Sequence, residues 1–505
     1  MAEHRSRYTD ARPTIRDMVT TVISHMPHIL IDTTTGRLLD KTKQAETFEK
    51  LPVFYTLVSS MTTHVDNERI EREVKDFYRY VMLSHKWQHN EPCYKDIKNI
   101  VVYKLSKNIK LQRFCSLARA LGFRWAWSDT CCINQEDNSI LQEALVAMFA
   151  WYRGSSLTIV YLHDVPSKSL WESIWNTRAW TYQEYVAAEI VRFYTKDWKP
   201  YLGLTLWNHK ESPIIIAEME RASRVPAKQM AKLLPGHERA REKLFLASMR
   251  RSTRVEDVAY SLLGIFNVPL IPMYGEGYRA VGRFLEHILT ASGDVIILAW
   301  TGTANNYNSC PPMNLTVYNS VVPPHIPQIR PPELDRIVTE LRASTADLSL
   351  VGILYERLNR LPLASLTSTR LLLPCIRFHI TNVVRSSRPA PDLSIHSYRA
   401  TMTALGDIEI RTSQLDMGKE HCLVHPWVRP LLDQDFSHGV AGLEVTTQAL
   451  RLVARLRQPF GALLLEKVSP MVYRRVAADS LIMVQIREEV SLTNLIDGVE
   501  TLYVK

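Results

Sequence analysis

Four short apolar runs between Tyr80 and Tyr194 restrict the fold of this chain more than any other feature. The stretches between the runs are long enough to form helices, and this alternation is typical of an open α/β sheet. Strands separated in this way need crossover connections, so we predict that they pair in parallel. The predicted strands are Tyr80–Ser84, Arg124–Ser128, Leu157–Leu162 and Ile190–Tyr194.

One of the intervening helices has a recognisable start. Ser139 is followed three residues later by Gln142, which is the spacing of a capping box, in which each side chain satisfies a backbone donor. Apolar residues then recur every three or four positions and mark one buried face. That face consists of Leu141, Leu145, Met148, Phe149 and Tyr152.

The whole chain divides by composition and pattern into five regions. Short apolar runs bounded by turn residues indicate strands, and clusters of proline indicate a linker. We predict an N-terminal lead-in segment over 1–75 with a strand at His28–Asp32, the sheet-forming core over 76–200, a helical extension over 201–300, a Pro-rich linker over 301–335 and a β-rich C-terminal region over 336–505.

Composition excludes several classes of protein. Of the 505 residues, 46% are hydrophobic and 22% are charged, which is a globular composition and not a disordered one. The net charge of +9 is spread along the chain without interleaved aromatic residues, which disfavours a nucleic acid partner. The seven cysteines have no CxxC spacing, and no apolar run approaches the ~18 residues that cross a bilayer. We therefore expect a cytoplasmic protein with no membrane span.

Chemically active residues gather in three blocks near the ends of the predicted strands. The blocks are Tyr80–Trp87, Trp125–Gln135 and Arg178–Glu184. Because the carboxyl ends of parallel strands share one edge of the sheet, where ligands bind, we expect the three blocks to meet in space.

Glu184 and Trp180 have the chemistry of a site that cleaves a glycosidic bond. A carboxylate can hydrogen-bond a ribose hydroxyl and stabilise the positive charge that develops as the bond breaks. Trp180, one helical turn earlier, can stack on a ring. The alternative is structural: Trp180 packs in the core, and Glu184 pairs with Arg178 or another cation at the surface. The residues alone leave both interpretations open.

Metal and nucleophile sites are disfavoured. His85, His89 and Cys93 are spaced by four residues, but Pro92 opposes the helix that would align them, so we predict no metal site. Ser84 and His85 are neighbours on a strand and point to opposite faces, so they do not form a serine and base pair.

The three blocks resemble the fungal heterokaryon incompatibility (HET) domain. The family pattern is an L-S-x-x-W strand, a W-x-D-x-x-C-I-x-Q block and an R-x-W-T-x-Q-E block. Residues 253–266 and 273–277 are similar to the segment that follows HET domains in many filamentous fungi, so the resemblance covers roughly residues 28–300. Gln88 departs from the pattern, because the family usually carries Gly there. The matching residues are Leu83, Ser84 and Trp87, then Trp127, Asp129, Cys132, Ile133 and Gln135, and then Arg178, Trp180, Thr181, Gln183 and Glu184.

The resemblance implies a role in self/non-self recognition and regulated cell death after unlike cells fuse. It also implies a fold similar to Toll/interleukin-1 receptor (TIR) domains, which is a flavodoxin-like, open and mostly parallel sheet with flanking helices. The third block resembles the TIR W-C-x-x-E pattern, whose Glu is catalytic in NAD-cleaving members. By this analogy Glu184 is catalytic, NAD is the substrate and no separate cofactor is required. The residues that the analogy places at the nucleotide are Ser84, His85, Trp87, Asp129, Arg178 and Trp180.

Two functions from different classes follow from the resemblance. The first is a NAD glycohydrolase-like effector. The second is a non-enzymatic death-signalling adaptor, in which the HET core self-associates and the C-terminal region senses a recognition partner that the sequence does not identify. Many TIR domains only bind other TIR domains, so the fold analogy does not choose between these functions.

Overall fold

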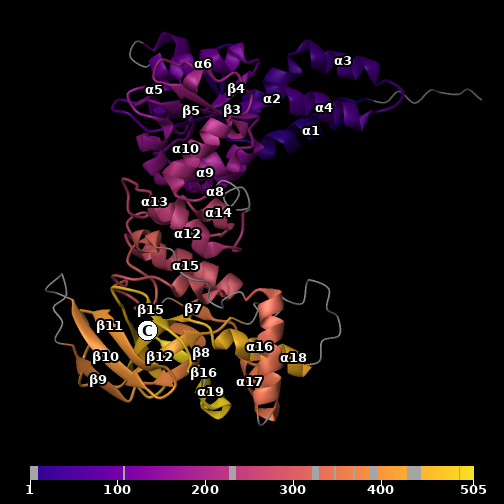
Figure 1. Cartoon of the computed structure of the whole chain (residues 1–505). Coiled ribbons are helices and arrows are strands. Elements are labelled where there is room, and N and C mark those ends of the chain that lie inside the picture. The colour runs from indigo at the N-terminus through magenta and orange to yellow at the C-terminus, as the bar shows by residue number, and fades with distance from the viewer. Residues whose placement is uncertain are drawn as a thin grey trace, which may run out of the picture. The chain divides into compact units, whose positions relative to one another are not determined.

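The computed structural model describes residues 10–105, 109–226, 235–320, 329–345, 348–367, 370–386, 395–413, 415–428, 445–487 and 490–505. The chain forms two compact units (Figure 1). Unit 1 consists of Met1–Leu234, Arg250–Thr253 and Tyr260–Pro272, and unit 2 consists of Pro235–Met249, Arg254–Ala259 and Met273–Lys505.

Unit 1 is built on a six-stranded sheet in the order β2-β1-β4-β3-β5-β6 (Figure 1). The four strands β3 to β6 pair in parallel, as predicted, and an α/β fold is confirmed. The strand predicted at His28–Asp32 is also present, but it runs antiparallel to β4 and forms a hairpin with β2, which the sequence did not predict. The strands are β1 (Ile29–Asp32), β2 (Arg37–Asp40), β3 (Tyr80–His85), β4 (Trp125–Trp127), β5 (Leu157–Leu162) and β6 (Val191–Thr195).

Burial on both faces explains why these strands read as apolar runs. Every residue of β3 and β5 is buried, as expected for parallel strands covered on both sides. In β4, Trp125 stacks on Tyr78 with ring centroids 6.0 Å apart, and Trp127 meets Trp151 and Tyr152 edge-on. Large aromatic side chains therefore fix this short strand within the core.

Helix α8 (Asn138–Gly154) begins two residues earlier than a capping box with Ser139 as the N-cap would allow. Asp137 is the N-cap, and its carboxylate accepts hydrogen bonds from the backbone N–H groups of Ser139 and Ile140 at 3.0 and 3.2 Å. The side-chain amide of Gln142 donates to the backbone oxygen of Pro272 at 3.1 Å instead of reaching back. The predicted capping box is thus wrong, because an aspartate two residues earlier is an equally strong cap.

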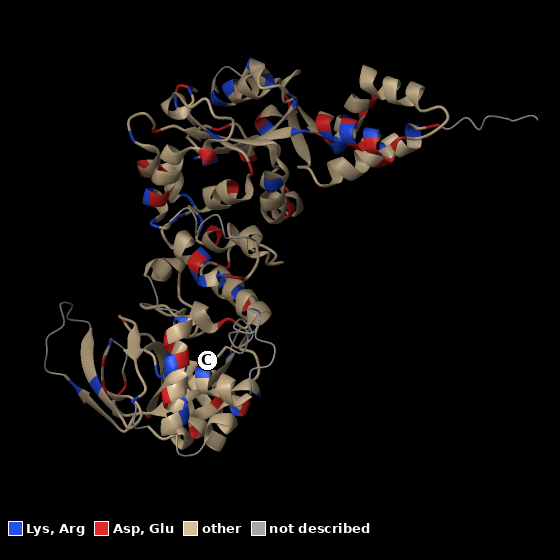
Figure 2. Ribbon diagram, turned by 45° about the vertical axis from the view of Figure 1, so that its right-hand side comes forward, with Lys and Arg blue, Asp and Glu red and all other residues tan. Residues whose placement is uncertain are grey.

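The other helices of unit 1 lie before, between and after the strands. They are α1 (Arg12–Ser24), α2 (Lys41–Glu49), α3 (Pro52–Ser60), α4 (Asn67–Phe77), α5 (Tyr94–Ile97), α6 (Ile109–Ala120), α7 (Asp129–Cys132), α9 (Ala179–Ala187), α10 (Pro213–Ser223) and α14 (Leu263–Phe266). Helix α13 (Asp257–Tyr260) contains a point of division between the units. In Figure 2 the ribbon of the N-terminal helices alternates between basic and acidic residues, as the sequences of α2 and α4 require. These exposed pairs, such as Lys75 with Glu71, solvate the helices and add little stability.

Unit 2 contains a sheet whose pairings close on themselves. β12 pairs with β13, β13 with β14, β14 with β16, β16 with β8, and β8 again with β12. Closure removes exposed strand edges. A separate three-stranded sheet has the order β11-β10-β9. The strands are β7 (Ser365–Thr367), β8 (Arg370–His379), β9 (Asn382–Arg385), β10 (His396–Met402), β11 (Gly406–Thr412), β12 (His421–Pro426), β13 (Phe460–Ser469), β14 (Val472–Val476), β15 (Ile482–Val484) and β16 (Val499–Val504).

Helices complete unit 2, and four of them, α16 to α19, share a hydrophobic core with the strands. Leu354, Leu358, Leu450 and Val453 pack in the same cluster as Phe378 of β8. The helices are α12 (Ala240–Ser248), α15 (Arg279–Ser292), α16 (Pro331–Ser344), α17 (Leu348–Asn359), α18 (Val445–Leu456) and α19 (Leu492–Gly498), with 3-10 helices η6 (Val295–Leu298) and η7 (Leu315–Asn319).

The described parts of the Pro-rich stretch, residues 301–320 and 329–335, belong to unit 2, and the second part includes the start of helix α16 at Pro331. Leu315 and Tyr318 of η7 are buried, and the Trp300 indole N–H donates to the backbone oxygen of Cys310 at 3.0 Å. Prolines 323, 324 and 327 lie outside the described residues.

A glycine marks the close approach of α14 to α8. A Cβ built on Gly264 would lie 2.1 Å from the Cβ of Phe149, which is too close for the two atoms to coexist. We expect Gly264→Ala to lower the free energy of unfolding by about 1–3 kcal/mol, because the helices must separate. Thermal unfolding followed by circular dichroism measures the change. The control is Gly352→Ala in α17, where the new Cβ meets no atom within 4 Å. Equal melting temperatures for the two variants would contradict this packing.

Candidate functional site

The carboxyl end of β3 brings the first and third sequence blocks into contact. Ser84, the second-last residue of β3, donates a hydrogen bond from Oγ to Oε2 of Glu184 on α9. The indole N–H of Trp175, on the 3-10 helix η3 (Ile174–Thr177), donates to Ser84 Oγ at 2.8 Å. All three side chains are buried. A chain of hydrogen bonds thus runs from Trp175 through Ser84 to Glu184.

Glu184 is a buried carboxyl group with a strongly shifted acidity. The residue is 3% exposed, and burial together with the charge of Asp129 raises the pKa of Glu184 to about 8. The hydroxyls of Ser84 and Tyr152 and the charge of Arg178 act in the opposite direction and lower it. Desolvation is the largest of these effects, because the charged form loses its water. At neutral pH the carboxyl is therefore mostly protonated.

The second block contributes Asp129, which binds the first block. Oδ2 of Asp129 accepts a hydrogen bond from the indole N–H of Trp87 at 2.6 Å. Nε2 of His85 lies 3.4 Å from Oδ1 of Asp129, but the geometry is not that of a hydrogen bond. Among the described residues neither ring nitrogen of His85 has a hydrogen-bond partner, although its side chain is only 1% exposed. His85 is thus an unsatisfied polar group beside a carboxylate.

Arg178 and Trp180 lie at the start of α9 but do not bind Glu184 directly. Arg178 is the N-cap residue and acts on Glu184 through its charge. Trp180 is half-buried, and within the described ranges its indole makes no hydrogen bond or ring contact. The surface ion pair of the structural alternative is wrong, because the Glu184 carboxyl is buried and accepts a hydrogen bond from Ser84.

The site depends on three residues that sequence reasoning did not assign to it. Trp175 precedes the third block and carries no motif of its own. Tyr152, which the periodicity of α8 placed in the core, donates its hydroxyl to the backbone oxygen of Leu83 at 3.0 Å. Arg250 donates to the backbone oxygen of Arg178 at 3.0 Å. Of the three, only Tyr152 was recognisable from the sequence, where the spacing of apolar residues predicted that it is buried.

The segment around Arg250 fixes the start of α9. The Arg250 guanidinium also donates to Thr181 Oγ1 at 3.1 Å and lies over the Tyr182 ring, 5.0 Å from its centroid. Burial lowers the pKa of Arg250 to about 10, so it stays charged at neutral pH. The next residue, Arg251, exchanges backbone hydrogen bonds with Thr177 and Ala179 at 2.7 and 2.9 Å. A segment some seventy residues later in sequence therefore orients the third block.

Comparison with known families identifies the domain to which this edge of the sheet belongs. The sequence model of the heterokaryon incompatibility protein (HET) family matches residues 80–171. The chain contains a HET domain. The match includes Ser84, His85, Trp87 and Asp129 and ends before Trp175 and Glu184.

A curated relative agrees with this assignment. The chain is 33% identical over 226 residues to vegetative incompatibility protein HET-E-1 of Podospora anserina. The aligned region is 41% of this chain and 16% of that protein, so the chain spans only a small part of the relative's length. No solved structure matches the chain.

The described ranges hold neither a metal-binding cluster nor a membrane-spanning helix. No group of three or more His, Cys, Asp or Glu side chains is placed to hold a metal ion there. None of the helices in those ranges combines the length and apolar character needed to cross a bilayer.

The raised pKa of Glu184 predicts how the stability of unit 1 depends on pH. Its folded-state pKa of about 8 lies above the ordinary 4.5, so the stabilisation is complete below about pH 4.5 and is lost as the pH rises through 8. Glu184→Gln stays neutral throughout. We expect the wild type to lose on the order of a few kcal/mol relative to this variant between pH 5 and 9.

Thermal or urea unfolding across this pH range measures the difference. Glu68→Gln, at an exposed position in the first turn of α4, is the matched control and is expected to show no such trend. A difference between wild type and Glu184→Gln that does not change with pH would contradict the raised pKa.

Proposed function

We propose that this chain acts in heterokaryon incompatibility, as a HET-domain protein that contributes to regulated cell death after unlike cells fuse. The HET match over residues 80–171 and the similarity to HET-E-1 support this role. We further propose that the HET domain cleaves NAD at the bond between nicotinamide and ribose.

The observation that carries the enzymatic proposal is the buried Glu184 carboxyl at the carboxyl end of the parallel strands. Across the sheet the four parallel strands lie in the order β4-β3-β5-β6. Numbered along the chain from β3, this is the order 2-1-3-4, which is also the order of the first four strands of a flavodoxin-like sheet. In such sheets ligands bind at the carboxyl edge where the strand order reverses, here beside β3 and β5. Ser84 and His85 end β3 at this edge, and Glu184 is bound to Ser84.

The proposed chemistry assigns each side chain a role. Glu184, in its ionised form, accepts hydrogen bonds from the ribose hydroxyls and stabilises the oxocarbenium-like charge as the bond to nicotinamide breaks. Ser84, held by Trp175, positions the carboxyl. Trp180 shapes the pocket. The negative charge of Asp129 adds to the effect of burial and raises the pKa of Glu184 further. Water then completes the hydrolysis of the ribosyl group.

Access to Glu184 requires a rearrangement. The residue is 3% exposed and its carboxyl is occupied by Ser84, so NAD cannot reach it in this conformation. The segment 130–138, which runs from helix α7 to the start of α8, and the half-buried Trp180 are the elements whose movement would open it. Self-association of HET domains is the event that we propose brings this about.

Release of nicotinamide by the purified full chain at high concentration tests the enzymatic proposal. We expect release from the wild type and a loss of about 10²–10³-fold in Glu184→Gln, because the amide cannot stabilise the developing charge. Glu189→Gln is the matched control, since Glu189 is exposed just beyond α9. Chromatography of the products measures the rate. Equal rates for wild type and Glu184→Gln would exclude Glu184 from catalysis.

The pH dependence of that reaction follows from the raised pKa of Glu184. Because the ionised carboxyl is the active form, we expect the rate to rise as the pH passes about 8. Asp129→Asn removes the second-largest cause of the raised pKa and keeps an oxygen that can accept from Trp87. The midpoint of its rate profile is expected at lower pH. A midpoint that does not move, or moves upward, would contradict the coupling between the two carboxyls.

The burial of Glu184 also favours a second function, the non-enzymatic adaptor. A carboxyl that is 3% exposed and bound by Ser84 is equally suited to fix α9 against β3. In that case the HET domain signals by self-association. Cell death that survives Glu184→Gln, with the variant folded and nicotinamide not released, is the outcome expected of the adaptor.

A further inference from the structure

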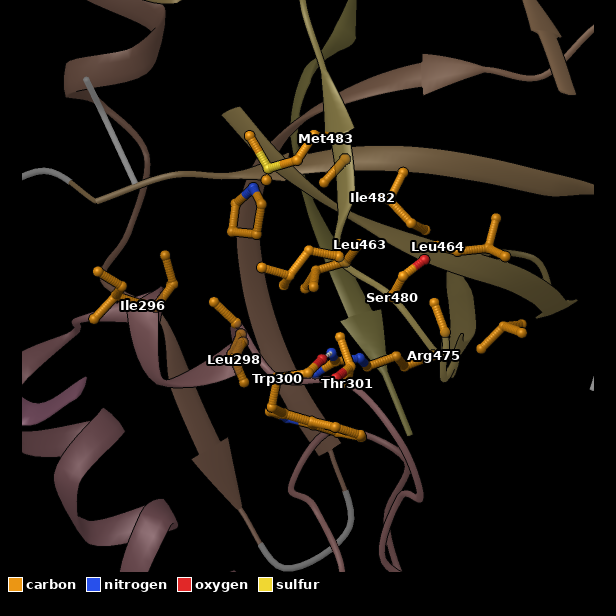
Figure 3. A pocket seen from close by; sticks show the side chains of 18 residues that line it. Ile296, Leu298, Trp300, Thr301, Leu463, Leu464, Arg475, Ser480, Ile482 and Met483 are labelled. Atoms are coloured by element: carbon orange, nitrogen blue, oxygen red, sulfur yellow. Dashed lines mark hydrogen bonds between the residues drawn. The ribbon is translucent and has the colours of Figure 1, made fainter. Parts of the chain in front are cut away.

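A small cavity in unit 2 lies between η6, β13 and β15 (Figure 3). Its volume is about 40 Å³, which is space for about three water-sized positions at ~10–15 Å³ each. The walls are mainly aliphatic and include Leu298, Leu463, Leu464, Ile482 and Met483. Such walls offer few hydrogen bonds to water, so the cavity favours an apolar group. Met483 is 41% exposed, which places the opening on the β15 side.

One charged side chain lines this cavity. Arg475 of β14 is 6% exposed and reaches toward Trp300 and Thr301 at one end of the lining (Figure 3). Nη2 of Arg475 donates to the backbone oxygen of Trp300 at 2.8 Å, and Nη1 donates to that of Cys310 at 3.4 Å. The guanidinium carbon lies 3.7 Å from the centroid of the Trp300 ring.

The charge of Arg475 has no counter-ion among the described residues. Burial lowers its pKa to about 10, so the guanidinium is still charged at neutral pH. The nearby buried Arg241 provides a comparison, because its Nε, Nη1 and Nη2 each donate to a backbone oxygen, those of Ala299, Tyr318 and Ser320. Arg475 has two such acceptors, and the second is distant. A buried cation without an anion is costly, and an anion in the cavity would offset that cost.

We propose that this cavity is a binding site for a short-chain aliphatic carboxylate. The guanidinium of Arg475 pairs with the carboxylate through the N–H groups that do not donate to Trp300 and Cys310, since a guanidinium has five such donors in one plane. The hydroxyls of Thr301 and Ser480 in the same lining supply further donors. The volume holds the carboxylate and the first one or two carbons of the acid, and in a longer acid the rest of the chain extends along the aliphatic walls toward the exposed Met483. Phosphate fits less well, since a single cation would face a larger charge and oxygens would lie against leucine side chains.

Binding of butanoate to the full chain tests the proposal. Isothermal titration and the shift in melting temperature are measured with sodium butanoate, 1-butanol and sodium phosphate at matched ionic strength. We expect butanoate to bind and to raise the melting temperature, and the alcohol to bind at least tenfold more weakly because it lacks the charge that pairs with Arg475. Acids from two to six carbons locate the best chain length.

Two variants separate binding in the cavity from binding elsewhere. Arg475→Lys keeps the charge without the fork, so we expect butanoate affinity to fall about tenfold. Arg475 also holds Trp300 and Cys310, so a second variant leaves it intact. Gly461 lines the cavity, and a Cβ there meets no atom within 4 Å, so Gly461→Leu is expected to fill the space and abolish binding. Gly352→Leu adds the same side chain outside the lining and is expected to bind like the wild type.

Each result decides the proposal. Butanoate binding that is lost in Gly461→Leu and retained in Gly352→Leu supports it. Equal binding of butanoate and 1-butanol, undiminished binding in Gly461→Leu, stronger binding of phosphate, or no binding of any acid from two to six carbons would overturn it.

Discussion

Burial of the Glu184 carboxyl is the constraint on which the arrangement of β3, η3 and α9 in unit 1 depends. A carboxyl removed from water is tolerated only when hydrogen bonds replace its hydration. Ser84 supplies one such bond, and it has a free lone pair for the Trp175 indole, so a strand, a 3-10 helix and α9 are joined through one hydroxyl. Any residue at position 84 without a hydroxyl leaves both Glu184 and Trp175 unsatisfied in the interior. Fold and candidate chemistry therefore rest on the same contact.

The same site shows that the matched region is not structurally self-sufficient. The HET match ends at residue 171, yet Trp175, Arg178 and Glu184 lie beyond it, and α9 is held at its start by Arg250 and Arg251. The Arg250 guanidinium donates hydrogen bonds to the carbonyl of Arg178 and the hydroxyl of Thr181 at the first turn of α9, where water would otherwise bind. The orientation of Glu184 thus depends on a segment that is distant in sequence. A shorter domain that lacked residues 250–253 would lose this support.

The features that depend on local pattern, such as the parallel strands, could be predicted from the sequence. The features that depend on contacts between residues distant in sequence could not. The runs that became β3 and β5 were recognisable because both faces of a parallel strand are buried. The start of α8 was misplaced because Asp137 and Ser139 are both good caps, and only the geometry shows that Asp137 accepts the bonds. Ser84, Asp129 and Glu184 were found through the motif blocks. Trp175 and Arg250 were not, because their roles arise from tertiary contacts that no spacing reveals.

Each unit buries an ionisable side chain that, among the described residues, has no oppositely charged partner in direct contact, a carboxyl in unit 1 and a guanidinium in unit 2. In unit 1 the buried Glu184 has neutral hydrogen-bond donors and a neighbouring carboxylate, so its charged form is disfavoured and a proton is retained at neutral pH. In unit 2 the buried Arg475 has neutral carbonyl acceptors, and its pKa of about 10 is still too high for it to lose its proton. A buried carboxyl becomes neutral by binding a proton, which removes the cost of burying its charge. A guanidinium would have to lose a proton to become neutral, and it does not do so at neutral pH. An anion bound beside Arg475 would therefore offset the cost of burying its charge. The neutral Glu184 carboxyl needs no counter-ion until a substrate or a rise in pH ionises it.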